Sequence, residues 1–158
     1  MIITENTMTR LKSILLGKDP RIKQFVIGTP ENPMGKRLSG KENKERIDNF
    51  EDEMKELHIP FIKIVGSYGN KENSYILPNL DVDIAEVIFG YEGYDQESFI
   101  VGECNADGVD YYYYQKNEGD SKYQLLDAER GITMMNDAED FFSSKKMWKF
   151  KIDFSIFR

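Results

Sequence analysis

Apolar side chains recur at helical spacing in three segments of the chain. Residues 4–16 predict a short amphipathic helix at the periphery of the domain, and residues 81–89 predict another helix with Asp81 as its N-cap. The clearest helix begins at Ser39, which together with Glu42 has the form of a capping box. One face of this helix carries an apolar stripe with spacings of three, four and three residues, formed by Ile47, Phe50, Met54 and Leu57.

Shorter apolar runs, some alternating with polar side chains, predict the strands of a sheet. The predicted strands are residues 24–28, 61–65, 74–77, 98–101, 110–115, 122–126 and 147–157. The polar connection at 66–70 predicts a hairpin with a longer loop, and residues 137–142 predict a short helical turn. Lysines alternate with apolar residues in the last strand, so one face of the sheet is in water and the pairing is mostly antiparallel.

These elements predict an α+β fold in which two main helices pack on one sheet of five to seven strands, mostly antiparallel or mixed. The length of 158 residues fits one domain spanning residues 1–158. With 40% apolar and 13% aromatic residues, the chain can fill a core, which argues against intrinsic disorder. No apolar run approaches the roughly 18–20 residues that cross a bilayer, so we expect no membrane association.

Charge is unevenly distributed along the chain. Residues 18–46 contain eight basic and four acidic side chains, whereas residues 81–120 contain eleven acidic side chains and one basic, Lys116. The formal net charge of −7 disfavours general nucleic-acid binding, because neutralisation of phosphates dominates such affinity. The basic loop is a candidate for holding an anion and the acidic middle for meeting a partner; the alternative is ordinary solvated surface.

No constellation of catalytic or metal-binding residues is evident. The chain has one cysteine, Cys104, and one histidine, His58, which excludes a disulfide framework and a histidine-rich metal site. His58 follows a predicted helix, where it can interact favourably with the helix carbonyls. Phosphate-loop and nucleophile-elbow motifs are missing. We therefore predict no catalytic residue, no metal and no cofactor, and an enzyme is less favoured than a binding protein.

Polar side chains recur where predicted elements begin or end. If the sheet brings these ends together, they offer a cation, amides and a carboxylate around one notch that suits a small polar or nucleotide-like ligand. The alternative is a buried polar network that holds loops, with Arg46 paired to Glu72. The candidate ligand-binding residues are Asn32, Asn43, Arg46, Tyr68, Glu72 and Gln96.

Four consecutive tyrosines at residues 111–114 lie in a predicted strand. Because side chains alternate across a strand, two are expected to pack and two, Tyr112 and Tyr114, to be exposed. Exposed tyrosines give a partner a large contact area, so these two form a candidate partner interface. Filling of the core and sheet is the alternative. If this strand lies at the edge of the sheet, it can also add a partner strand.

Several short motifs resemble one family. The sequence ENPMG at residues 31–35, the segment 39–46, and the later motifs YG at 68–69, ENSY at 72–75 and YDQES at 94–98 occur in this order. In these motifs, from about residue 24 to 102, the chain resembles the DUF3293-like group of small bacterial and tailed-phage proteins of unknown function. The resemblance implies a phage or prophage setting and a compact α/β fold, and implies no reaction.

The leading hypothesis is a phage-encoded accessory protein, more a binder than an enzyme, that binds a host or virion protein. It would act in the cytoplasm of the host bacterial cell or in the virion. One alternative is a ligand-binding domain or enzyme in which Arg46 holds an anion, Glu72 orients or acts as a base, and Gln96 reads a polar edge. Another is a structural component of the virion. The sequence leaves the oligomeric state open.

Overall fold

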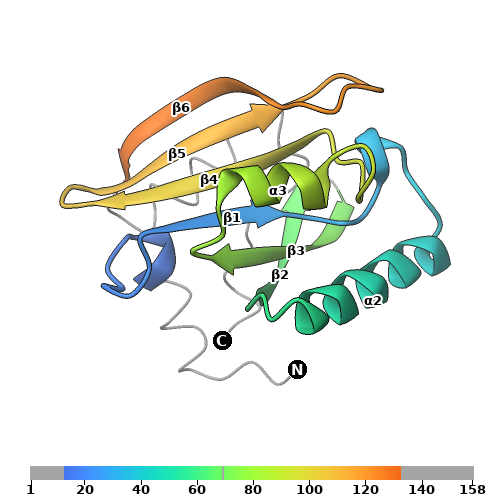
Figure 1. Cartoon of the computed structure of the whole chain (residues 1–158), viewed down its shortest axis with the longest axis horizontal. Coiled ribbons are helices and arrows are strands. Elements are labelled where there is room, and N and C mark those ends of the chain that lie inside the picture. Colours follow the sequence, from blue (N-terminus) through green and yellow to red (C-terminus); the bar gives the residue numbers. More distant parts are fainter. Residues whose placement is uncertain (1–12, 69, 133–158) are drawn as a thin grey trace.

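An antiparallel sheet forms the centre of the protein in the computed structural model, which describes residues 13–68 and 70–132 (Figure 1). Six described strands pair in the order β2-β3-β1-β4-β5-β6, and every pair is antiparallel. This confirms the predicted α+β class. The strands are β1 (Gln24–Gly28), β2 (Ile62–Tyr68), β3 (Asn70–Pro78), β4 (Ser98–Asn105), β5 (Gly108–Gln115) and β6 (Gln124–Ile132).

Two helices cover one face of this sheet, α2 (Gly40–Glu56) and α3 (Val82–Phe89) (Figure 1). A single 3-10 turn, η1 (Pro33–Gly35), lies in the connection between β1 and α2. Residues 13–15 are helical, whereas the rest of the predicted helix 4–16 lies outside the described residues. The predicted turn at 137–142 and strand at 147–157 also lie outside the described residues.

The start of α2 has the predicted capping box. The backbone N–H of Glu42 donates to Ser39 Oγ at 3.1 Å, and the Ser39 N–H donates to Glu42 Oε1 at 3.3 Å. Each contact satisfies a backbone donor that has no partner within the helix. The cap therefore fixes where the chain enters α2.

The end of α2 corrects one prediction. Leu57 was expected in the buried stripe with Phe50 and Met54, but its side chain is 56% exposed. The helix ends because His58 adopts a left-handed φ of 58°, the Ile59 N–H donates to the Met54 carbonyl and the His58 N–H to that of Lys55. This hydrogen-bonding pattern is a Schellman motif, which turns the chain away from the helix axis and leaves Leu57 outside the core.

The core between the sheet and the helices is aromatic. Phe50 of α2 lies 4.6 Å from the Tyr75 ring and 5.9 Å from the Phe89 ring, measured between ring centroids. Glycine makes room for such rings on β1, since a Cβ at Gly28 would lie 2.6 Å from Phe89 Cζ. On the opposite face Gly102 of β4 leaves space in the same way for another ring. The two glycines are thus required by packing.

The strands pair over longer stretches than the sequence predicts. β2 and β3 form the predicted hairpin, but the expected loop at 66–70 is largely strand. β4 and β5 form a hairpin that turns at residues 106–107, where Asn105 Oδ1 accepts from the Asp107 N–H at 2.8 Å. β5 therefore lies between β4 and β6 and has neighbours on both sides.

Candidate functional site

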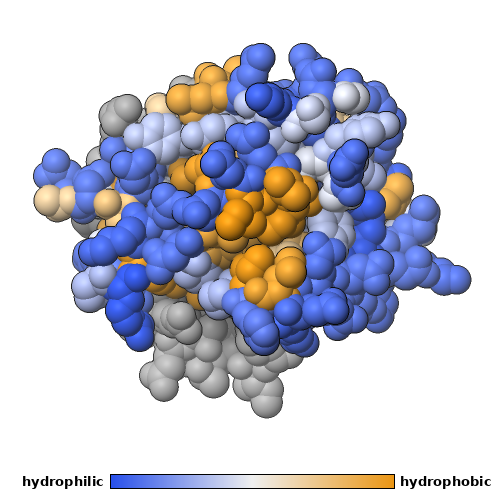
Figure 2. Space-filling model, viewed as in Figure 1, coloured by the Kyte–Doolittle hydropathy of each residue, from blue (hydrophilic) through white to orange (hydrophobic). Residues whose placement is uncertain are grey.

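The outward face of α3 is apolar. Val87 is 74% exposed and Ile84, one helical turn before it, is 45% exposed, whereas Ala85, Ile88 and Phe89 are buried. A helix that is apolar on both faces is typical of burial on both sides, yet one side of α3 is open. Figure 2 shows this region as an apolar patch at the centre of the face that α3 occupies.

Tyr112 and Tyr114 lie on the same side of the sheet as α3. Both are partly buried and pack against the core cluster that includes Phe89 and Phe99. The Tyr114 ring stacks on Phe99 with a centroid distance of 5.3 Å and an interplanar angle of 10°. Tyr111 and Tyr113 are fully buried on the other side of β5, as the alternation predicts. Tyr112 and Tyr114 are thus held in place by the core while part of each stays accessible.

β5 is an inner strand, so it cannot add a partner strand at its edge. Its backbone groups are used in the ladders with β4 and β6. A partner would therefore contact the side chains of Tyr112 and Tyr114 and would form no backbone hydrogen bonds with β5.

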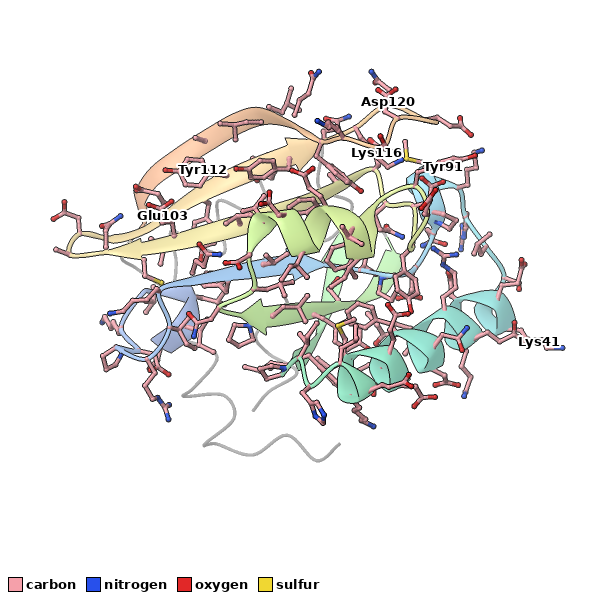
Figure 3. The ribbon with its side chains drawn as sticks, in the orientation of Figure 1. Lys41, Tyr91, Glu103, Tyr112, Lys116 and Asp120 are labelled. Carbon is pink, nitrogen blue, oxygen red and sulfur yellow. The ribbon has the colours of Figure 1, made fainter. Side chains whose placement is uncertain are left out.

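Acidic side chains lie on α3 and near Tyr114. Burial raises the pKa of the Tyr114 phenol, and the negative charges of Glu86 on α3 and Glu103 on β4 raise it further. Asp83 is exposed on α3. Neither Asp83, Glu86 nor Glu103 forms an ion pair with any of the residues that the structure describes. Figure 3 shows Glu103 on β4 and Tyr112 on the neighbouring strand β5.

We name this region the α3–β5 surface. Its apolar members are the two exposed α3 side chains and the accessible parts of two tyrosines. Its acidic members come from α3 and β4. The surface comprises Ile84, Val87, Tyr112, Tyr114, Asp83, Glu86 and Glu103.

The predicted notch residues converge in part. Asn43 Nδ2 donates to Asn32 Oδ1 at 3.0 Å, and Asn43 Oδ1 accepts from the Asn32 N–H at 3.1 Å. Asn32 Oδ1 also accepts from the Leu38 N–H at 2.9 Å. These contacts hold the η1 loop, in which Asn32 and Met34 have left-handed φ angles, against the first turns of α2.

Arg46 joins two loops to α2. Its Nε donates to the Pro30 carbonyl and its terminal nitrogen to the Tyr94 carbonyl, and its guanidinium lies 5.5 Å from the centroid of the Tyr94 ring. Burial lowers the pKa of Arg46, although Tyr94 and Asp95 oppose this shift. Gln96 also donates to the Tyr94 carbonyl, at 3.1 Å.

The four notch residues thus form two hydrogen-bonded sets, Asn32 with Asn43, and Arg46 with Gln96 through the Tyr94 carbonyl. Both the ligand hypothesis and the loop-holding alternative are compatible with these contacts. Tyr68 and Glu72 lie in β2 and β3, and Glu72 pairs in register with Gly66. Their side chains lie outside the described part of the chain. Ligand binding at Asn32, Asn43, Arg46 and Gln96 stays a prediction.

Sequence reasoning missed a buried ion pair beside these residues. The Lys116 side chain is fully buried, and its Nζ lies 2.6 Å from Asp95 Oδ1 and 3.3 Å from Met34 Sδ. Tyr91 lies over the same ammonium group, 6.0 Å from its ring centroid (Figure 3). The available signal was that Lys116 is the single basic residue within the acidic stretch 81–120.

Glu31 was likewise missed. It is 8% exposed, and its carboxylate accepts from the Asn73 N–H. Burial raises the pKa of Glu31, whereas the contact with Asn73 and the charge of Lys63 oppose the shift. Thr29 Oγ1 donates to the Asn73 carbonyl at 2.6 Å, so the loop after β1 is tied to β3 through both backbone groups of Asn73.

Among the described residues, no three side chains of His, Cys, Asp or Glu gather as a metal would require. Cys104 is half-buried, and burial raises the pKa of its thiol. Within residues 13–68 and 70–132 no helix is long and apolar enough to span a membrane.

Fold and surface together define a single sheet with helices on one face and an acid-bordered apolar patch on that face. Residues 29–97 match the model of a family described as "Protein of unknown function (DUF3293)". The match confirms the predicted resemblance to a DUF3293-like family. No curated protein and no solved structure matches the chain. The matched segment contains α2, α3 and the Arg46 network, and ends before Tyr112 and Tyr114.

Proposed function

We propose that this protein is a non-enzymatic accessory protein of a bacteriophage or prophage that binds a host or virion protein through the α3–β5 surface. The observation that carries the proposal is the 74% exposure of Val87 beside Ile84 on a helix whose other face is core. Exposed apolar patches bordered by polar groups are typical of interaction sites. The site of action would be the cytoplasm of the host cell.

The energetics of such a surface favour association. Burying an exposed Val or Ile side chain contributes about 1.5–3 kcal/mol, and Val87 and Ile84 are available together. Tyr114 is already stacked on Phe99, so a partner orders it at small entropic cost. Pre-ordered aromatic side chains next to exposed aliphatic ones are typical of the centre of a protein interface.

A pull-down with tagged full-length protein from lysate of phage-infected host cells tests this proposal. We expect the parent to recover one specific protein. Neither Val87→Asp nor the double variant Tyr112→Ala/Tyr114→Ala should recover it. The conservative variant Val87→Leu, which keeps an apolar side chain, should still recover it. Equal recovery with parent and Val87→Asp would reject the surface. Capsid or tail proteins in the recovered fraction would assign the partner to the virion.

A further inference from the structure

We propose that the α3–β5 surface binds a basic amphipathic α-helix of its protein partner. This inference rests on the proposed function and specifies the partner's chemistry. Three properties of the surface carry it: its charge, the use of its backbone groups, and the spacing of its apolar side chains.

The charge of the surface selects a cationic partner. Residues 81–115, which contain α3, β4 and β5, include nine acidic side chains and no lysine, arginine or histidine. Glu86 lies on α3, and Glu103 of β4 follows Val101, the register partner of Tyr112, by two residues, so both carboxylates lie on the α3 side of the sheet. Lysine or arginine at the rim of a partner would meet these carboxylates and speed its association.

The same charge argues against a second copy of this chain as the occupant. A symmetric dimer places the same patch of both subunits face to face. Asp83, Glu86 and Glu103 of each copy would then oppose carboxylates of the other, and like charges brought together disfavour an interface. The acidic border therefore points to a partner of different charge.

Backbone hydrogen bonding selects a helical partner segment. β5 is paired on both sides, and the hydrogen bonds of α3 run along its own axis, so this surface offers no row of free N–H and C=O groups like the edge of a sheet. An extended segment that lay on it would bury backbone groups without partners. A helix satisfies its own backbone groups and contacts the surface by side chains alone.

The spacing of the apolar side chains agrees with this choice. Ile84 and Val87 are three residues apart and form a short ridge on the eight-residue helix α3, which is about 12 Å long. Rows of side chains at this spacing pack into the groove of a second helix. A partner helix of about two to three turns would cover this ridge.

A displayed library of random peptides of about 16 residues tests the inference, with selection on the full-length parent and removal of clones that bind Val87→Asp. The expected winners carry lysine or arginine on one face and apolar residues at positions i, i+3, i+4 and i+7. The best synthetic peptide should become helical on binding, as measured by circular dichroism. Its affinity should fall at least tenfold for Val87→Asp, a loss of about 1.4 kcal/mol.

Matched charge variants complete the test. Glu86→Lys should lower the affinity of the peptide severalfold. Glu45→Lys, at an exposed position of α2, should leave that affinity within twofold of the parent. Added salt should weaken binding of the peptide to the parent. The inference would be overturned if the library yielded acidic or proline-rich peptides, or no enriched peptide. It would also be overturned if Glu86→Lys and Glu45→Lys lowered the affinity of the peptide equally. If the lysate pull-down still depends on Val87 in that case, the proposed function stands and only the partner's chemistry is wrong.

Discussion

The ammonium group of Lys116 lies 2.6 Å from the Asp95 carboxylate, and the Lys116 side chain has no exposed surface. This contact joins the residue after β5 to the loop after α3. The Met34 N–H also donates to the Asp95 carbonyl at 2.8 Å, so three separate segments meet at Asp95. Asp95 has a left-handed φ of 50°, a conformation that such surrounding contacts stabilise.

Replacement of Lys116 by alanine should lower the free energy of unfolding by about 3 kcal/mol, because removal of one partner of a buried ion pair leaves the other without compensation. The Asp95 side chain is 29% exposed, so the loss is expected at the lower end of the roughly 3–5 kcal/mol that removal of one partner of a buried ion pair costs. Urea denaturation measures the change. Lys116→Met combined with Asp95→Asn should cost less than Lys116→Ala; an equal or larger cost would contradict the pairing.

Arg46→Ala should lower the free energy of unfolding by about 2 kcal/mol, since the Pro30 and Tyr94 carbonyls lose a charged donor. Arg46→Lys should restore part of that loss and should leave recovery of the protein partner unchanged. Thermal denaturation with and without nucleotides measures the change in stability, and the lysate pull-down measures recovery of the partner. A nucleotide that stabilised the parent but not Arg46→Lys would support the ligand alternative instead.

Gly102→Ala should lower the free energy of unfolding by about 1–3 kcal/mol, because the added methyl group would overlap the Phe25 ring on the next strand. Gly40→Ala is the matched control. A Cβ at position 40 meets no atom within 4 Å and lies at the start of α2, so this variant should be neutral or more stable. Equal effects of the two variants in urea denaturation would refute the packing argument.

The pH dependence of the free energy of unfolding should show the effect of the Glu31 carboxyl group. Burial raises its folded pKa above the ordinary 4.5, so the folded state binds the proton more tightly than the unfolded state does. The resulting stabilisation is complete below the ordinary pKa and is lost as pH rises through the raised pKa. As the pH falls from about 7 to about 4, the parent should therefore gain stability relative to Glu31→Gln. The opposite slope would show that the Asn73 contact and Lys63 outweigh burial.

Local signals in the sequence were sufficient for much of the fold. Ser39 and Glu42 lie three residues apart in one turn, so their capping box depends on neighbouring residues alone. The end of α2 was less predictable, because the residue in the left-handed conformation is His58 where glycine is usual. Helical periodicity therefore assigned Leu57 to the core, although the chain had already turned.

The candidate site depends on tertiary contacts that periodicity does not encode. Apolar residues of α3 occupy its outward side as well as its buried side, so the sequence indicates neither that Ile88 is buried nor that Val87 is exposed. Lys116 is separated from Asp95 by 21 residues and from Met34 by 82, and only the packed loops bring them together. The alternation of Tyr111 and Tyr112 was predictable, but the inner position of β5 was not.

Photo-crosslinking tests the central claim most directly. A benzoyl-phenylalanine residue replaces Val87 in the full-length protein, and the same residue at Glu45 on α2 serves as the control; both positions are exposed. Irradiation in phage-infected host cells should link position 87 to one specific protein, with excess parent but not Val87→Asp suppressing the product. Position 45 should give no such product. Equal crosslinking from both positions, or none from position 87, would contradict the proposal that the α3–β5 surface binds a protein.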